Sequence, residues 1–145
     1  MGGSSYRYDP ATLINTSVGM NEPILFVSLN YRVGLLGFAN GVQAEKAGAT
    51  NLGLLDQEMA VQWVIKNIKA FGGDPSRVTL SGQSAGSVAT SWHVLANRLP
   101  IAGAILESGT ANTCVLSNTI HFIRRTDSCK LQVGCSHSKR PTKRL

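Results

Sequence analysis

The most constraining feature of this sequence is a Gly-x-Ser-x-Gly motif, Gly82-Gln-Ser-Ala-Gly86, between a predicted strand and a predicted helix. The strand is the apolar run 77–81, and the helix extends over 84–97, before Pro100. In this context the serine occupies a sharp turn, and the small residues Gly82 and Gly86 let neighbouring backbone pass close. The motif predicts that Ser84 is an exposed nucleophile, with an ordinary tight glycine turn as the alternative.

The N-terminus of the helix that begins at this turn is expected to stabilise a negatively charged group near the serine. Its first backbone N–H groups have no acceptor within the helix, and its positive dipole end points at the serine. The N–H of Ala85, the residue after the serine, is therefore expected to donate to an oxyanion.

The rest of the chain up to about residue 106 alternates apolar strands with helical patterns. Ile24–Tyr31 predicts a buried strand, 54–69 an amphipathic helix, and 101–106 a further strand. Glycines 34, 37 and 41 predict a loop between the first strand and the helix. This order indicates an α/β fold with a parallel sheet and crossover helices.

Charge and hydropathy exclude several classes of protein. Hydrophobic residues make up 43% of the 145 residues and charged ones 15%, which is typical of a globular chain. No apolar run approaches the ~18 residues that a membrane-spanning helix needs. Residues 1–113 are charge-balanced, and the net charge of +6 resides in 114–145, so we predict no nucleic-acid binding.

The basic C-terminal part differs in character from what precedes it. Residues 128–145 contain few large apolar side chains, so we predict a disordered tail. The Lys/Arg cluster at 139–144 is either a nuclear-import or nucleic-acid patch or a basic tail without function. We divide the chain into a domain fragment, 1–112, and a basic tail of different character, 113–145.

Four blocks besides the serine motif give the chain a recognisable pattern. The sequence resembles the type-B carboxylesterase/lipase family, relatives of the cholinesterases, and in particular its fungal members. The resemblance extends over about residues 1–112. It is carried by Phe71-Gly-Gly-Asp-Pro through Gly86, and by Asn30-Tyr-Arg-Val-Gly-Leu-Leu-Gly-Phe38, Asn51-Leu-Gly-Leu-Leu-Asp-Gln57, Trp63-Val-Ile-Lys-Asn-Ile68 and Ile105-Leu-Glu-Ser-Gly109.

The resemblance implies a partial α/β-hydrolase fold with a nucleophile elbow at Ser84. It implies hydrolysis of a small carboxylic ester through an acyl-enzyme, with Ala85 as an oxyanion donor and without a cofactor or metal. Ser108 matches a family position near the catalytic acid and histidine, where a supporting role and an ordinary turn serine are both open. Arg32 and Asp56 match positions that form an internal salt bridge, with two solvated charges as the alternative.

The resemblance also implies that parts of the machinery are missing. Such hydrolases need a histidine base, an acid and further oxyanion donors, in the chain order serine, acid, histidine. In the family, the acid and histidine follow far beyond the length of this chain, and the glycine-rich oxyanion loop precedes the segment matched by its start. We therefore expect a truncated, weakly active or inactive esterase.

The histidines present offer no clear substitute. His93 lies nine residues after Ser84 on the same predicted helix, ~13.5 Å along the axis, and is expected to have no catalytic role. A triad from Asp127 and His137 would lack preorganisation in a flexible tail. The spacing of the tail cysteines and histidines fits no common zinc pattern.

Two alternatives to an esterase stay open at this point. The chain could be a non-catalytic, cholinesterase-like interaction module, or a non-folding gene-model fragment. Asn15-Thr-Ser17 is either a glycosylation sequon or a chance match in a polar loop. Neither the oligomeric state nor the localisation follows from the sequence.

Overall fold

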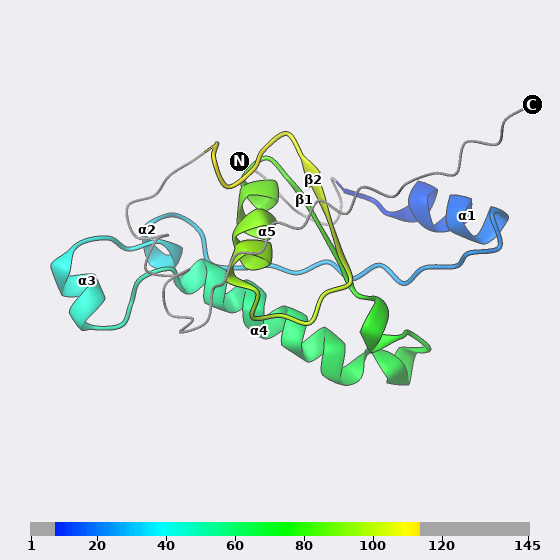
Figure 1. The fold of residues 1–145 in the computed structure, drawn as a ribbon, viewed down its shortest axis with the longest axis horizontal. Coiled ribbons are helices and arrows are strands. Elements are labelled where there is room, and N and C mark those ends of the chain that lie inside the picture. Colours follow the sequence, from blue (N-terminus) through cyan, green and yellow to red (C-terminus); the bar gives the residue numbers. More distant parts are fainter. Residues whose placement is uncertain (1–7, 114–145) are drawn as a thin grey trace, which may run out of the picture.

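The computed structural model describes residues 8–113. Helices dominate this part of the chain, and the two strands lie near its C-terminal end (Figure 1). In chain order the elements are α1 (Ala11–Gly19), α2 (Gly34–Gly37), α3 (Val42–Lys46), α4 (Leu52–Asn67), the 3₁₀ helices η1 (Ile68–Phe71) and η2 (Pro75–Arg77), β1 (Thr79–Gln83), α5 (Ala85–Ala96) and β2 (Gly103–Glu107).

The two strands form a parallel pair joined by α5. Their register runs from Thr79 opposite Gly103 to Gln83 opposite Glu107. α5 packs against both strands, so the three elements make one β-α-β unit (Figure 1). The predicted α/β class with a parallel sheet and a crossover helix is therefore confirmed for this part of the chain, with both strands displaced by two residues at their starts.

The core lies where α5 meets the first half of α4. The buried cluster comprises Leu54 from α4 and Val88, Ala89, Trp92 and Ala96 from α5. Along α4 and η1 the buried positions 54, 57, 61 and 68 form one stripe, as the predicted amphipathic helix requires. α5 ends at Ala96, and the next residue, Asn97, has a left-handed φ of 49°, which asparagine tolerates at a helix C-terminus.

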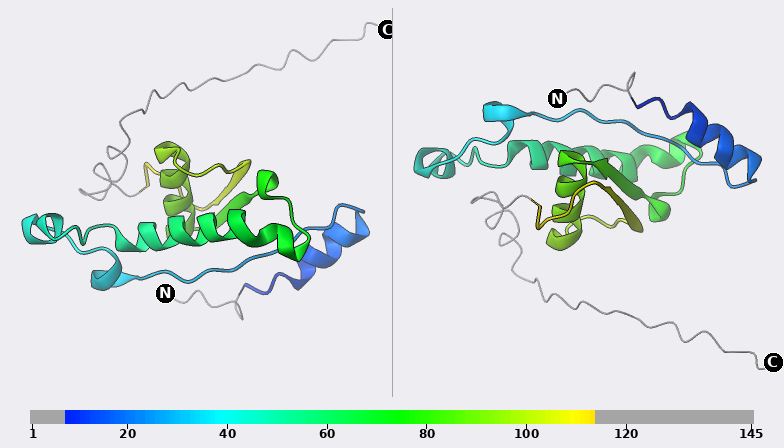
Figure 2. Two further views of the ribbon diagram at one scale, coloured as in Figure 1. Left: turned by 90° about the horizontal axis from the view of Figure 1, so that it is seen from below. Right: turned by 90° about the horizontal axis from the view of Figure 1, so that it is seen from above.

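The predicted buried strand at Ile24–Tyr31 is wrong for this structure. The segment is extended but belongs to no strand, and the side chains of Ile24 to Val27 are 41–52% exposed. Figure 2 shows it running alongside α4. A strand needs hydrogen bonds from a neighbouring backbone, and no described segment pairs with this one. Its apolar composition is typical of a buried strand, but no neighbouring strand among the described residues pairs with it.

The glycine-rich region after this segment also differs from the prediction. It contains the single-turn helices α2 and α3 rather than a continuous loop. An isolated parallel bridge joins Ala39 to Thr50 across α3. α1 was not predicted. The predictions for the tail, 113–145, concern residues that are almost all outside the described part of the chain.

Candidate active site

Ser84 forms the turn between β1 and α5. Its backbone has φ 54° and ψ −118°, and the residue is solvent-exposed. A positive φ in a residue other than glycine stores strain of about 1–3 kcal/mol, which surrounding structure must hold in place. The strand, the sharp turn and the helix therefore occur in the order that the motif predicts, with the serine on the surface.

Two hydrogen bonds hold this strained turn. The Ser84 N–H donates to the carbonyl oxygen of Glu107 at 2.8 Å, and the Ser84 carbonyl accepts from the N–H of Val88 at 3.0 Å. The first bond ties the turn to the end of the neighbouring strand. It also engages the Ser84 N–H, whereas Ala85 is the first residue of α5, where an N–H has no acceptor within the helix.

The two glycines of the motif are not equivalent. A Cβ on Gly82 would lie 2.3 Å from the carbonyl carbon and oxygen of Gly86, so no side chain fits there. A Cβ on Gly86 would meet nothing within 4 Å among the described atoms. The expected close backbone approach is thus made at Gly82, and Gly86 supplies the backbone that Gly82 approaches.

A second strained serine lies beside the first. Ser108 has φ 58° and directly follows β2, as Ser84 follows β1. Because Gln83 is opposite Glu107 in the parallel register, both serines leave the sheet at its C-terminal edge. Ser108 is solvent-exposed, and its location next to Ser84 is compatible with a supporting role.

Ser87 fixes the segment after β2, and the sequence reasoning did not identify it. Its side chain is completely buried, and its Oγ donates to the carbonyl oxygen of Gly109 at 2.5 Å. A Cβ on Gly109 would lie 3.0 Å from the carbonyl oxygen of Ser84. The loop at 108–109 therefore packs against the first turn of α5. No pattern in the sequence distinguishes Ser87 from an ordinary helix serine.

His93 belongs to the core and not to the serine turn. It is 4% exposed, and its Nε2 donates to Oε1 of Gln57 on α4 at 2.9 Å. Burial lowers the pKa of His93 to about 4, and the positive charge of Arg98 adds to this lowering. The imidazole therefore joins α5 to α4 in its neutral form. His121 and His137 lie outside the described residues.

Arg32 and Asp56 form the expected ion pair. Arg32 Nη2 lies 2.6 Å from Asp56 Oδ1, and both its Nε and its backbone N–H donate to Oδ2, at 2.8 and 3.0 Å. Hydrogen bonds from the Arg32 side chain and backbone lower the pKa of Asp56 to about 2. A second pair, Arg98 with Glu58 at 3.0 Å, joins the residues after α5 to α4. Both pairs attach a loop to α4.

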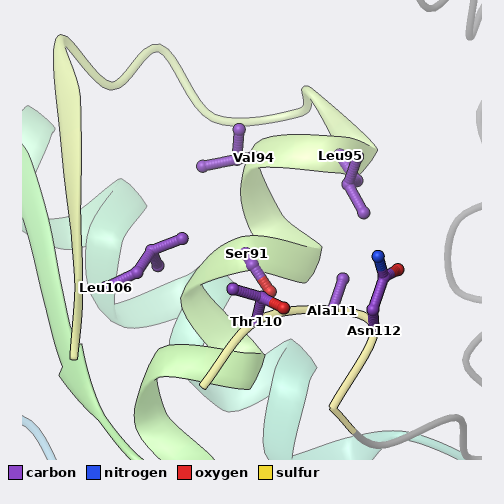
Figure 3. A pocket seen from close by; sticks show the side chains of 7 residues that line it. All are labelled: Ser91, Val94, Leu95, Leu106, Thr110, Ala111 and Asn112. Atoms are coloured by element: carbon purple, nitrogen blue, oxygen red, sulfur yellow. The ribbon is translucent and has the colours of Figure 1, made fainter. Parts of the chain in front are cut away.

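A small cavity lies on the same helix but away from the serine turn. It has a volume of about 250 Å³ and lies between the second half of α5, β2 and the segment after β2 (Figure 3). Ser91, Leu95, Leu106 and Ala111 are among its lining residues, and Ser84 is not. Ser91 Oγ donates to the carbonyl of Val88 in its own helix. The cavity is therefore separate from the candidate site.

Among residues 8–113 there is no group of three or more His, Cys, Asp or Glu that could hold a metal ion. None of the helices within that range is long and apolar enough to cross a membrane.

Comparison with known sequences identifies the family. Residues 1–144 match the model of the carboxylesterase family. The chain belongs to the carboxylesterase family. It is 41% identical over 116 residues to "Secreted triacylglycerol lipase LIP1" of Gibberella zeae, which is 74% of this chain and 20% of that protein.

Two further relatives are named as a lipase and as an inactive carboxylesterase-like protein. "Lipase 4" of Diutina rugosa is 48% identical over 97 residues, 67% of this chain and 18% of the relative. "Inactive carboxylesterase-like protein VdtD" of Byssochlamys spectabilis is 40% identical over 114 residues, 77% of this chain and 20% of the relative. The chain thus spans at most about a fifth of the length of these curated relatives.

Proposed function

We propose that this chain is part of the α/β-hydrolase domain of a serine carboxylic-ester hydrolase, with Ser84 as the nucleophile. The observation that carries the proposal is the strained, exposed backbone of Ser84 between a parallel strand and a helix N-terminus. Membership of the carboxylesterase family and the lipase names of the relatives support an ester as the substrate.

The proposed chemistry begins with attack of Ser84 Oγ on the ester carbonyl carbon, while the proton of the Ser84 hydroxyl passes to the base. The carbonyl oxygen becomes an oxyanion, which accepts a hydrogen bond from the Ala85 N–H at the positive end of α5. Collapse of the tetrahedral intermediate expels the alcohol, which takes up a proton, and leaves an acyl group on Ser84. Water then hydrolyses this acyl-enzyme.

Neighbouring residues would hold the nucleophile in position. Gly82 allows the backbone before Ser84 to meet the backbone of Gly86 after it. Ser87, through Gly109, fixes the loop that carries Ser108, and that loop holds Ser108 next to Ser84 at the edge of the sheet. A supporting role for Ser108 next to the catalytic groups is part of the proposal.

The base and the acid that the reaction needs are proposed to lie outside the described residues. His93 is buried against Gln57 and therefore does not serve Ser84. Loss of triad members costs on the order of 10⁴- to 10⁶-fold in turnover. We therefore expect this chain by itself to hydrolyse esters very slowly.

Acetylation by an activated aryl ester tests the nucleophile directly. The full chain is incubated with p-nitrophenyl acetate, and peptide mass spectrometry locates the acetyl group. We expect Ser84 to be acetylated faster than Ser81, an exposed serine in β1 with ordinary strand backbone. Ser84→Ala should remove this adduct and the slow release of p-nitrophenol, whereas Ser81→Ala should retain both.

Equal rates of acetylation at Ser84 and Ser81 would contradict the proposal that Ser84 is the nucleophile. Fast, Ser84-dependent turnover would instead show that the chain supplies its own base, and would overturn the expected weak activity.

A second candidate is a non-catalytic interaction module with the same fold. One relative, named an inactive carboxylesterase-like protein, favours it. The acetylation experiment separates the two candidates, because an interaction module has no reason to keep Ser84 more reactive than Ser81.

A further inference from the structure

One face of α1 is fixed against the rest of the molecule through Ser17. This residue is 9% exposed. Its Oγ donates to the carbonyl of Ile14 at 2.7 Å and accepts from the N–H of Ile24 at 3.3 Å. The second bond joins the helix to the extended segment that follows it. Ser17 therefore marks the inward side of α1.

Asn15 lies on the outward side of the same helix. Two residues correspond to about 200° of rotation, so Asn15 points about 160° away from Ser17. The residue is exposed, as is Thr16 beside it. All views place α1 at one end of the described chain, away from α5 and the strands (Figures 1 and 2). A bulky group on Asn15 would meet no described element and would leave the serine turn open.

Asn15-Thr-Ser17 is also the single Asn-x-Ser/Thr sequence in the whole chain. It lies in α1, with the acceptor residue exposed to solvent. Its two essential groups have opposite environments, because the acceptor amide is exposed and the hydroxyl is enclosed. Transfer of a glycan must therefore precede the docking of α1.

We propose that Asn15 is an N-glycosylation site, used when the chain enters a compartment that carries out this modification. Asn15 Nδ2 forms a bond to the anomeric carbon of a lipid-linked diphospho-oligosaccharide. The bond from that carbon to the phosphate oxygen breaks, the lipid diphosphate leaves with its electron pair, and the amide loses one proton. The proposal is independent of any esterase activity.

The glycan would also cover exposed apolar surface. Val18 is 61% exposed and lies three residues after Asn15, on the same side of α1. A hydrophilic glycan at Asn15 shields this side chain from intermolecular contact.

Translation of the full chain with endoplasmic-reticulum microsomes tests the proposal. The chain carries a cleavable signal sequence in front and a C-terminal tag with one reporter Asn-Ala-Thr sequon, so that every translocated chain bears at least one glycan. Translocated wild type should carry two glycans sensitive to endoglycosidase H, and Asn15→Gln should carry one.

Two variants serve as matched controls. Ser17→Thr keeps the required hydroxyl and should carry two glycans. Asn112→Gln changes another exposed asparagine, which is followed by Thr-Cys, and should also carry two. A translocated wild type with the reporter glycan alone, or an Asn15→Gln chain that keeps both, would overturn the proposal.

Discussion

The β1–α5–β2 unit and the extended segment Ile24–Tyr31 differ in strand pairing, although the extended segment has the more continuous apolar sequence. The unit closes on itself through a parallel register, the Ser84–Glu107 bond and the Ser87–Gly109 bond. The extended segment has no strand partner among the described residues. Exposure does not separate the two regions, because Ile24 to Val27 are 41–52% exposed and Ile105 and Leu106 in β2 are 51% and 40% exposed. In the described part of this chain, the two strands that pair are adjacent along the sequence and are joined by one helix.

The same contrast bears on whether the chain is stable by itself. Leu35 and Leu36 in α2, the next helix after the extended segment, are 79% and 78% exposed. Exposed apolar surface and unpaired backbone favour association between molecules. Soluble expression of the full chain with a sharp thermal transition would show that it folds by itself, and would exclude a non-folding fragment.

The largest expected effect comes from a substitution at Gly82, where the backbone of β1 approaches the backbone of α5 most closely. Gly82→Val places a side chain where a Cβ already lies 2.3 Å from the backbone of Gly86, so we expect destabilisation of about 4 kcal/mol or more. Gly86→Ala is the matched control, because its Cβ meets nothing within 4 Å and alanine favours a helix by up to about 1 kcal/mol. Urea denaturation measures both. Equal losses would show that the two glycines have the same role.

The next effect compares one substitution in the two regions. Val88→Thr puts a hydroxyl into the core, where Val88 is 6% exposed, and should cost up to about 3 kcal/mol. Val27→Thr in the extended segment, where the side chain is 44% exposed, should change stability by no more than about 0.5 kcal/mol. Thermal and urea unfolding provide the comparison. A large loss at Val27 would mean that the segment is packed after all.

Acid should weaken the closed unit through His93. Its pKa is about 4 in the folded chain against 6.5 for the free side chain, so between these values the unfolded state binds more protons. Stability is therefore complete above about pH 6.5 and falls as the pH decreases toward 4, by about 2 kcal/mol at pH 5. Urea titrations at pH 7.5 and 5 measure this, and His93→Gln should remove most of the difference.

Protonation of Asp56 should lower the stability of the folded chain in a more acidic pH range than protonation of His93 does. Its folded pKa is about 2, below the ordinary 3.8, so the stability from its pair with Arg32 is lost only between about pH 4 and pH 2. A loss already complete at pH 5 in the His93→Gln variant would contradict the assignment of the first window to His93.

The smallest expected effect has the opposite sign. Ser84→Gly removes the cost of φ 54° for a residue with a side chain and should stabilise the chain by about 1 kcal/mol while abolishing acetylation. Ser81→Gly, at an ordinary position in β1, should destabilise it instead. If Ser84→Gly were also destabilising, the turn would not be strained.

The fold could be predicted wherever local pattern and chain connectivity agree. The apolar stripe of α4, the strand before Ser84 and the helix after it needed no distant information, because each is decided by neighbouring residues. The strand at 24–31 was mispredicted because pairing depends on a partner that composition does not reveal. α2 and α3 were missed because glycines mark turns without saying whether one helical turn fits between them.

The sequence by itself determined the family, the position of Ser84 and its place between a strand and a helix, because that motif depends on residue types at fixed spacing. Only the tertiary structure decided that Gly82 and not Gly86 meets a steric limit, that Ser87 holds the loop carrying Ser108, and that His93 is buried against Gln57. The physical reason is that each of these outcomes depends on which atoms approach in space, and sequence spacing does not encode that approach.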